Sequence, residues 1–383
     1  MDTTSAGVVI NQTQWQSVAG WNVVQGTFLA AVVVVGCFFN VFIVTAVLSS
    51  RKLRRRITDV LCCHLALVGI VWSTLLLPTN VLAAFTGGWP LRGTERGPCD
   101  TYGCAQSFLV HVTMWTIAML GWNKYRTIST PLRHVSAINR QRIAIILLPI
   151  WTSGLMLACI PRISRPHVGS YGYSTEITTC IYQPSLTTDN DAPTIASVVY
   201  SFATTVFGFL LPVGVTAHSY FRIYSIARWH RKRIALMSAV VQVISLSVGV
   251  PMSGQGLPEV SRQNGNRNPP AANAAADQCW DRKTSRNVLA FVLAMIVCYA
   301  PHYSLVAVAT ALRRFSHPPY SFTSSLQFPV PVEALSSIIL SASPVVNGFI
   351  YGVRNRSMIR SFRSLVSPPT LGERLQRHMM SNV

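Results

Sequence analysis

Charged residues are scarce in this chain of 383 residues. They make up 11% of the sequence, against about 25% in soluble domains, and this low value argues against a soluble enzyme. Acids are the scarcest, since 12 Asp and Glu stand against 32 Lys and Arg and leave a formal net charge of +20. In a soluble chain that excess would indicate a nucleic-acid binder, so the positions of the charges have to decide the class.

Other signals are also missing. Nine cysteines are too few to form a disulfide framework in a chain of this length, so we expect at most a local bridge. The segment before Thr27 has neither a cationic start nor a cleavage site, and we therefore expect the first apolar span to direct membrane insertion itself. A membrane enzyme is a further alternative, but intramembrane hydrolases need paired acids or metal-ligand clusters, and the apolar stretches contain few acids and no inward-facing His-x-x-x-His pair. We predict no metal site and no cofactor.

Long apolar stretches are what the chain has instead, since 50% of its residues are hydrophobic. A helix needs about 20 apolar residues to cross a bilayer. Seven stretches approach or exceed that length, over about 27–48, 57–85, 99–125, 143–160, 196–226, 288–312 and 330–353. They predict an all-α membrane protein, a seven-helix bundle over 27–353. A marginal stretch, 235–250, is expected either to extend the fifth helix or to lie at the membrane interface.

The basic residues give this bundle an orientation. If residues 1–26 lie outside, the inner segments hold 26 of the 32 Lys and Arg, so the inner face carries about +21 and the outer face about −1. The inner parts are then a long loop, 228–281, and a short amphipathic helix with a tail, 354–383. Asn11 would lie outside as a glycan acceptor. The inner charge is an orientation signal, attracts anionic membrane lipid, and needs no nucleic acid to explain it.

Short motifs follow one another along the spans in a fixed order. They are Gly36-x-x-x-Asn40, Leu65-Ala66 with Pro78, Trp89, Cys99, Trp151, Pro212 with Tyr220, Cys298-x-x-Pro301 and Asn347-x-x-x-Tyr351. In this order and spacing the chain resembles the rhodopsin-like (class A) G-protein-coupled receptors from about residue 36 to 365. The resemblance implies a plasma-membrane receptor that is not an enzyme and that transmits an outer stimulus to a heterotrimeric G protein. The inner contact would be Lys124 with the second inner loop at Pro131, Leu132 and Arg133.

The resemblance also implies a disulfide in the outer part. Cys99 begins the third span, and Cys180 is the single cysteine of the long loop after the fourth. Both would lie in the oxidising compartment, where a bridge would hold that loop over the bundle. The alternative is two free thiols.

Three switch positions of the family are altered here. Gly69 stands where the family has an acid, which makes a sodium site improbable. The Asp-Arg-Tyr triplet is Asn123, Lys124 and Tyr125, and a lysine paired with Asp281 would lack the bidentate fork of arginine. The last motif has Gly348 between Asn347 and Tyr351, with Pro344 one turn earlier. We expect an inner switch of Tyr220, Tyr351 and Lys124 with a shifted balance between resting and active states.

A ligand pocket is expected between the outer halves of the third, fifth, sixth and seventh spans. Its predicted lining is Gln106, Ser107, Val110, Tyr299, His302, Tyr303, Glu333, Ser337 and Ser341. Gln106 stands where amine receptors carry an aspartate, so a ligand amine held by that pair is disfavoured. The seventh span has no lysine for a retinal Schiff base. His302 is either a hydrogen-bonded packing residue or a proton sensor.

A membrane transporter or channel is the alternative function. Transporters often contain inverted repeats with broken helices in paired halves, and no such internal symmetry occurs in this sequence.

Overall fold

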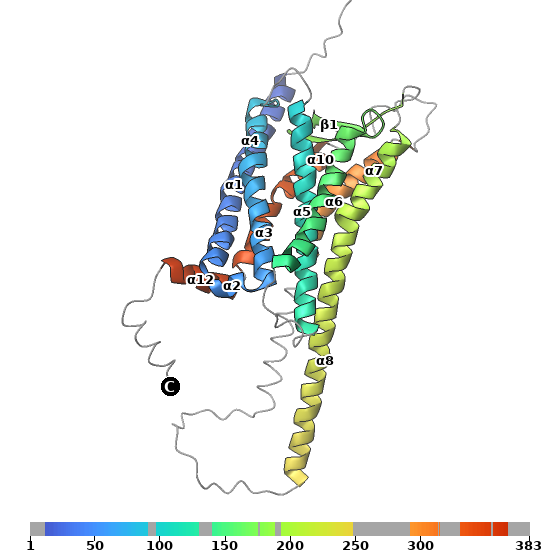
Figure 1. Cartoon of the computed structure of the whole chain (residues 1–383). Coiled ribbons are helices and arrows are strands. Elements are labelled where there is room, and N and C mark those ends of the chain that lie inside the picture. Colours follow the sequence, from blue (N-terminus) through green and yellow to red (C-terminus); the bar gives the residue numbers. More distant parts are fainter. Residues whose placement is uncertain are drawn as a thin grey trace, which may run out of the picture.

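The computed structural model describes residues 12–90, 97–129, 140–174, 177–187, 193–247, 292–312, 314, 330–353 and 355–366 (Figure 1). Seven of its helical segments are long and apolar enough to cross a membrane, as predicted: Gly20–Ser49, Ile57–Thr86, Gly97–Ser129, Ile143–Ile163, Ile195–Val240, Val292–Leu312 and Val332–Gly352. We refer to them as spans one to seven.

The helices divide as follows. Span one is α1 (Gln12–Ser49), followed by the short α2 (Arg51–Arg54); span two joins α3 (Ile57–Val71), η1 (Trp72–Leu76) and α4 (Leu77–Thr86). Spans three and four are α5 (Gly97–Ser129) and α6 (Arg140–Ile163), and span five joins α7 (Ile195–Thr205), η3 (Val206–Leu210) and α8 (Leu211–Ser247). Span six is the helix Val292–Leu312, and span seven joins α10 (Val330–Ser341), α11 (Ser343–Gly348) and η4 (Phe349–Val353), before α12 (Arg356–Val366).

Prolines explain two of the internal breaks. The π-helical turns η1 and η3 each end two residues before a proline, Pro78 and Pro212. Because proline has no N–H for the carbonyl four residues earlier, the preceding turn widens instead of continuing the regular ladder. The spans therefore stay continuous through a widened turn.

The surface of the bundle is apolar where lipid would lie. Val34, Leu75 and Met156 are 67%, 64% and 72% exposed, and large apolar side chains exposed on several spans are expected of a membrane protein rather than a soluble one. Polar side chains such as Asn40 and Asn80 are buried inside the bundle, where other helices supply their partners.

Helix α8 corrects one predicted boundary. It continues as a helix to Ser247, so the segment predicted as a loop from residue 228 begins as helix, and the described part of 235–250 extends the fifth span. Figure 1 shows α8 reaching well beyond the ends of the other helices.

The bundle also carries a β-hairpin that the sequence did not predict. Strands β1 (Gly169–Ser174) and β2 (Thr179–Pro184) pair antiparallel, with Tyr173 opposite Cys180. The hairpin follows span four and lies across the outer end of the bundle (Figure 1).

Candidate functional site

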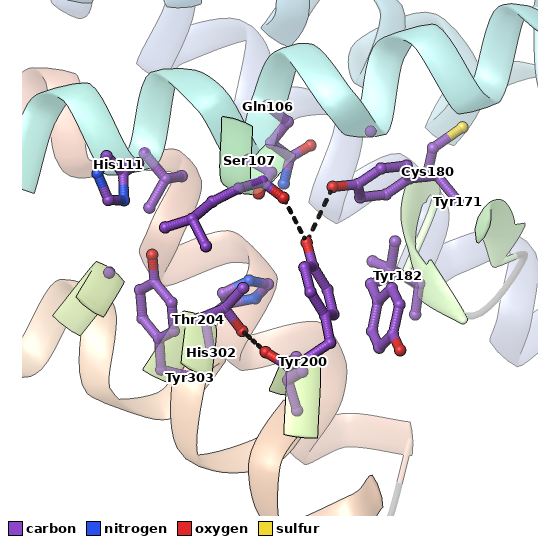
Figure 2. A pocket seen from close by; sticks show the side chains of 16 residues that line it. Gln106, Ser107, His111, Tyr171, Cys180, Tyr182, Tyr200, Thr204, His302 and Tyr303 are labelled. Carbon is purple, nitrogen blue, oxygen red and sulfur yellow. Dashed lines mark hydrogen bonds between the residues drawn. The ribbon is translucent and has the colours of Figure 1, made fainter. Parts of the chain in front are cut away.

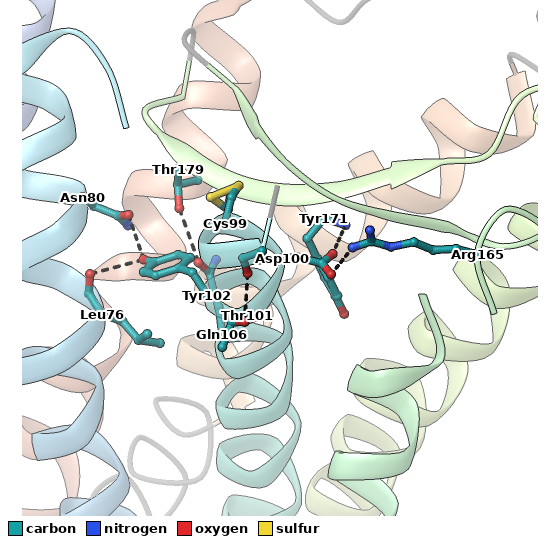
Figure 3. The surroundings of a disulfide bond; sticks show 12 residues. Leu76, Asn80, Cys99, Asp100, Thr101, Tyr102, Gln106, Arg165, Tyr171 and Thr179 are labelled. Atoms are coloured by element: carbon teal, nitrogen blue, oxygen red, sulfur yellow. Dashed lines mark hydrogen bonds and ion pairs between the residues drawn. A yellow bond between two sulfur atoms is a disulfide. The ribbon is translucent and has the colours of Figure 1, made fainter. Parts of the chain in front are cut away.

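A disulfide fixes the hairpin to span three. Cys99 at the start of α5 is bonded to Cys180 of β2, with their Cα atoms 5.6 Å apart (Figure 3). Of the two alternatives for these cysteines, the structure therefore has the bridge. It holds the second strand over the mouth of the bundle.

Asp100, the next residue of α5, anchors the other strand. The residue is only 3% exposed, and its carboxylate pairs with the guanidinium of Arg165 and accepts a hydrogen bond of 3.1 Å from the backbone N–H of Tyr171 (Figure 3). One helical turn below, a Cβ on Gly103 would come within 2.5 Å of the Tyr171 ring. The absence of a side chain at position 103 is what lets the hairpin sit this close to α5.

Two adjoining cavities lie beneath the hairpin, with volumes of about 60 and 120 Å3. They share five lining residues, Gln106, Ile181, Tyr182, His302 and Val306, and so form one site between span three, span six and β2. Gln106 is tied to the hairpin, since the hydroxyl of Thr179 donates to its amide oxygen at 3.4 Å. The volume suits a compact ligand rather than a long one.

Tyrosine hydroxyls give the site its polarity (Figure 2). The Tyr171 hydroxyl donates to the carbonyl of Ala158 at 2.9 Å and lies 3.5 Å from the Tyr200 hydroxyl, which in turn donates to the carbonyl of Leu157 at 3.1 Å. Burial raises the pKa of Tyr171 to about 12, so its phenol stays neutral at physiological pH. The Tyr303 ring stacks on Phe209 with centroids 5.6 Å apart.

The structure brings most of the predicted pocket residues to this site. Gln106, Ser107, Val110, His302 and Tyr303 line the first cavity, and Glu333 and Ser337 line the second. Tyr299 and Ser341 line neither, which corrects that part of the prediction. Span six runs outward and span seven inward, so each of these two residues lies one turn deeper than Tyr303 or Ser337, where packed side chains fill the bundle.

Sequence reasoning missed the residues that come from the hairpin and from α7. Tyr171, Ile181, Tyr182, Tyr200 and Thr204 all line the first cavity. The signal that could have found them is the concentration of Tyr171, Tyr173 and Tyr182 in the loop that carries Cys180.

Five of the predicted switch residues, Asn123, Lys124, Tyr125, Tyr220 and Tyr351, lie at the inner end of the bundle. The Lys124 ammonium lies 5.5 Å from the centroid of the Tyr351 ring, and Asp59 of α3 attracts it electrostatically. Asn123 donates to the Thr58 hydroxyl at 2.9 Å, which fixes α5 against α3. The ring of Tyr125 lies edge-on to His218 of α8, and Tyr220 of the same helix is buried.

A buried hydrogen bond joins spans six and seven between the cavity and this inner end. The Asn347 amide donates to the Tyr299 hydroxyl at 3.3 Å. Asn40 donates to the carbonyls of Gly36 and Pro344 at 2.7 and 3.2 Å, which fastens span one to the kink of span seven. Asn11, Pro131, Leu132, Arg133 and Asp281 lie outside the described residues.

Comparison with known proteins agrees with this architecture. The chain matches the family described as 7 transmembrane receptor (rhodopsin family) over residues 39–351, and it belongs to that family. It is therefore a multi-pass membrane protein of a family of receptors, not of enzymes.

Individual relatives are distant. The D(1B) dopamine receptor of Xenopus laevis is 24% identical over 61% of this chain and 48% of its own length, and that of Homo sapiens is 22% identical over 57% and 48%. The chain thus spans about half the length of the curated relatives it matches. The crystal structure of squid rhodopsin superposes with a TM-score of 0.64 at 17% identity, over 91% of this chain and 86% of the other.

Proposed function

We propose that this receptor transmits an outer stimulus, bound beneath the β-hairpin, to a heterotrimeric G protein at the inner face. The observation that carries the proposal is the Asn347–Tyr299 hydrogen bond, which links span six to span seven midway between the two sites. A ligand in the cavity touches span six at His302 and Tyr303, and Tyr299 lies one turn deeper on the same helix.

The path continues along span seven. Asn347 is one turn from Tyr351, whose ring lies under the Lys124 ammonium of span three. A displacement of span six therefore reaches Lys124 through two contacts, Tyr299–Asn347 and Tyr351–Lys124. Separation of spans three and six at that level would open a cleft at the inner face. The G protein would contact Lys124 together with Pro131, Leu132 and Arg133 of the second inner loop.

The residues that line the cavity indicate the charge and size of the ligand. The relatives named above are dopamine receptors, and a bound amine requires a compensating carboxylate in a buried site. At the position where amine receptors carry an aspartate, this chain has Gln106, with tyrosine hydroxyls around it. The carboxylate of Glu333 lines only the second cavity. We infer a compact, uncharged ligand held by hydrogen bonds rather than an amine held by an aspartate.

A panel of G proteins tests the proposal. The purified chain would be assayed for nucleotide exchange first without ligand and then with neutral small molecules. Tyr299→Phe removes the hydroxyl that accepts from Asn347 and should change basal exchange about fivefold. Tyr102→Phe is the matched control, because it removes another buried tyrosine hydroxyl, bonded to Asn80 at 2.7 Å, in the outer half of the bundle.

Three outcomes would contradict the proposal. One is a folded chain that activates no G protein under any condition, and another is an equal effect of the two tyrosine substitutions. The third is transport of a solute by the chain in vesicles without a G protein, which would favour the carrier alternative.

A further inference from the structure

A separate groove lies at the inner face, far from the hairpin. It is an open groove of about 750 Å3 between the end of α1, the short helix α2 and α12. Arg51, Lys52, Arg56 and Arg360 line it together with serine hydroxyls that include Ser357 and Ser364. Within the described part of the chain no acid lines this groove.

The groove is built by packed contacts rather than by loose side chains. Met358 of α12 is fully buried, and the centroid of the Phe362 ring lies 4.6 Å from that of the Phe42 ring on α1. The Ser361 hydroxyl donates to the carbonyl of Ala46 at 3.0 Å. On the other wall, the buried side chain of Leu53 packs α2 against the bundle. The two basic walls are thus fixed relative to each other.

The position of the groove matches the headgroup layer of the inner leaflet. Span one ends at Ser49, and α2 follows it directly. Helix α12, which follows span seven, lies beside α2 at the same level (Figure 1). Helix α12 buries Met358 and packs Phe362 against α1 while Arg360 and Arg363 are exposed, as in a helix that lies in the membrane interface. Residues 354–383 contain no cysteine, so no S-acyl chain can anchor them to the membrane.

We propose that this groove binds the headgroup of an inner-leaflet phospholipid that carries phosphate monoesters, as phosphoinositides do. Four cations around one groove fit a multiply charged headgroup better than a headgroup with one net negative charge. Arginine forks bind phosphate oxygens in bidentate fashion, and serine hydroxyls donate to the remaining oxygens. The acyl chains would extend along the exposed apolar surface of α1.

The test uses the full chain in an uncharged detergent with a short-chain phosphatidylinositol 4,5-bisphosphate as the probe. The groove variant is Arg51→Gln/Arg56→Gln/Arg360→Gln. The control is Arg54→Gln/Arg55→Gln/Arg363→Gln, which removes the same charge from exposed positions of the same segments that do not line the groove. At about fivefold for each cation, the groove variant should bind roughly a hundredfold more weakly, and the control less than about fivefold more weakly.

Two further probes separate the sources of phosphate. Phosphatidylserine and the soluble inositol trisphosphate should each bind at least about tenfold more weakly than phosphatidylinositol 4,5-bisphosphate. An equal loss in both variants, or equal binding of phosphatidylserine, would overturn the site. Equal binding of the soluble headgroup would overturn the assignment to a lipid. Unchanged thermal unfolding of both variants shows that binding, not folding, was altered.

Discussion

The side-chain amide of Asn40 occupies the space that a side chain at position 69 would need. A Cβ on Gly69 would lie 2.7 Å from the Asn40 Oδ1 atom, while the Asn40 Nδ2 atom donates to the carbonyls of Gly36 and Pro344. The missing carboxylate at position 69 and the position of Asn40 are therefore one feature, because the asparagine packs directly against the glycine.

Gly69→Ala should consequently destabilise the receptor. The added methyl group forces Asn40 away from its two carbonyl partners, and overpacking of this kind costs about 1–3 kcal/mol. Thermal unfolding in detergent measures the change. Gly214→Ala on α8 is the control, since a Cβ there has nothing within 4 Å and should be neutral or stabilising. Equal behaviour of the two variants would refute the packing argument.

Lys124→Arg should lower basal G-protein activation. The Asp59 carboxylate is buried, and its Oδ2 atom has no hydrogen-bond partner within the described residues. An arginine fork can bond that oxygen where a lysine supplies a point charge, so it would hold span three more tightly to span two in the resting state. A charge-assisted bond of about 1.5 kcal/mol predicts roughly a tenfold reduction.

Asp59→Asn tests the same pair of residues by changing the other partner. It removes the charge that attracts Lys124, so basal nucleotide exchange should rise, and Lys124→Arg should have little effect in the Asp59→Asn background. If the arginine lowers activity equally in both backgrounds, Asp59 is not its partner and the inner switch has to be assigned elsewhere.

Most of the fold could be predicted from the sequence because membrane physics constrains it strongly. The seven spans follow from apolar length, and the faces follow from the distribution of Lys and Arg. The hairpin could not be predicted in this way, because its strands are held by Cys99 and Asp100, which lie some 70 to 80 positions earlier in the chain. Such pairings depend on tertiary contacts rather than on local pattern.

For the cavity residues, the sequence points to those on the helices and not to those on the hairpin. Counting back along span three from Lys124 puts Gln106, Ser107 and Val110 on its inward face, and all three line the first cavity. Such counting does not fix depth, and Tyr299 and Ser341 lie one turn deeper than Tyr303 and Ser337, which line the cavities. The sequence alone does not fix the extension of α8 to Ser247, because about 16 mostly apolar residues fit a helix extension and an interfacial segment equally well.

Gln106→Asp should create a response to cationic amines that the unmodified receptor lacks. Gln106 lines both cavities, and a carboxylate there would face the tyrosine hydroxyls and still accept from Thr179. Pairing a buried carboxylate with an ammonium should strengthen amine binding at least about tenfold. Radioligand binding measures it, with Gln106→Asn as the uncharged control. Strong amine binding to the unmodified chain would contradict the proposed ligand class.

Arg165→Gln should loosen the hairpin, because it leaves the carboxylate of Asp100 buried without its counter-charge. Breaking a buried ion pair from one side costs about 3–5 kcal/mol. The Arg165 side chain is 38% exposed, so water screens part of the pair and we expect about 2 kcal/mol in thermal unfolding. The double variant Asp100→Asn/Arg165→Gln should recover part of that loss, since the asparagine carries no charge and its amide oxygen can still accept from the Tyr171 N–H. If the double variant is less stable than Arg165→Gln alone, the penalty comes from lost packing of the arginine and not from the unpaired carboxylate.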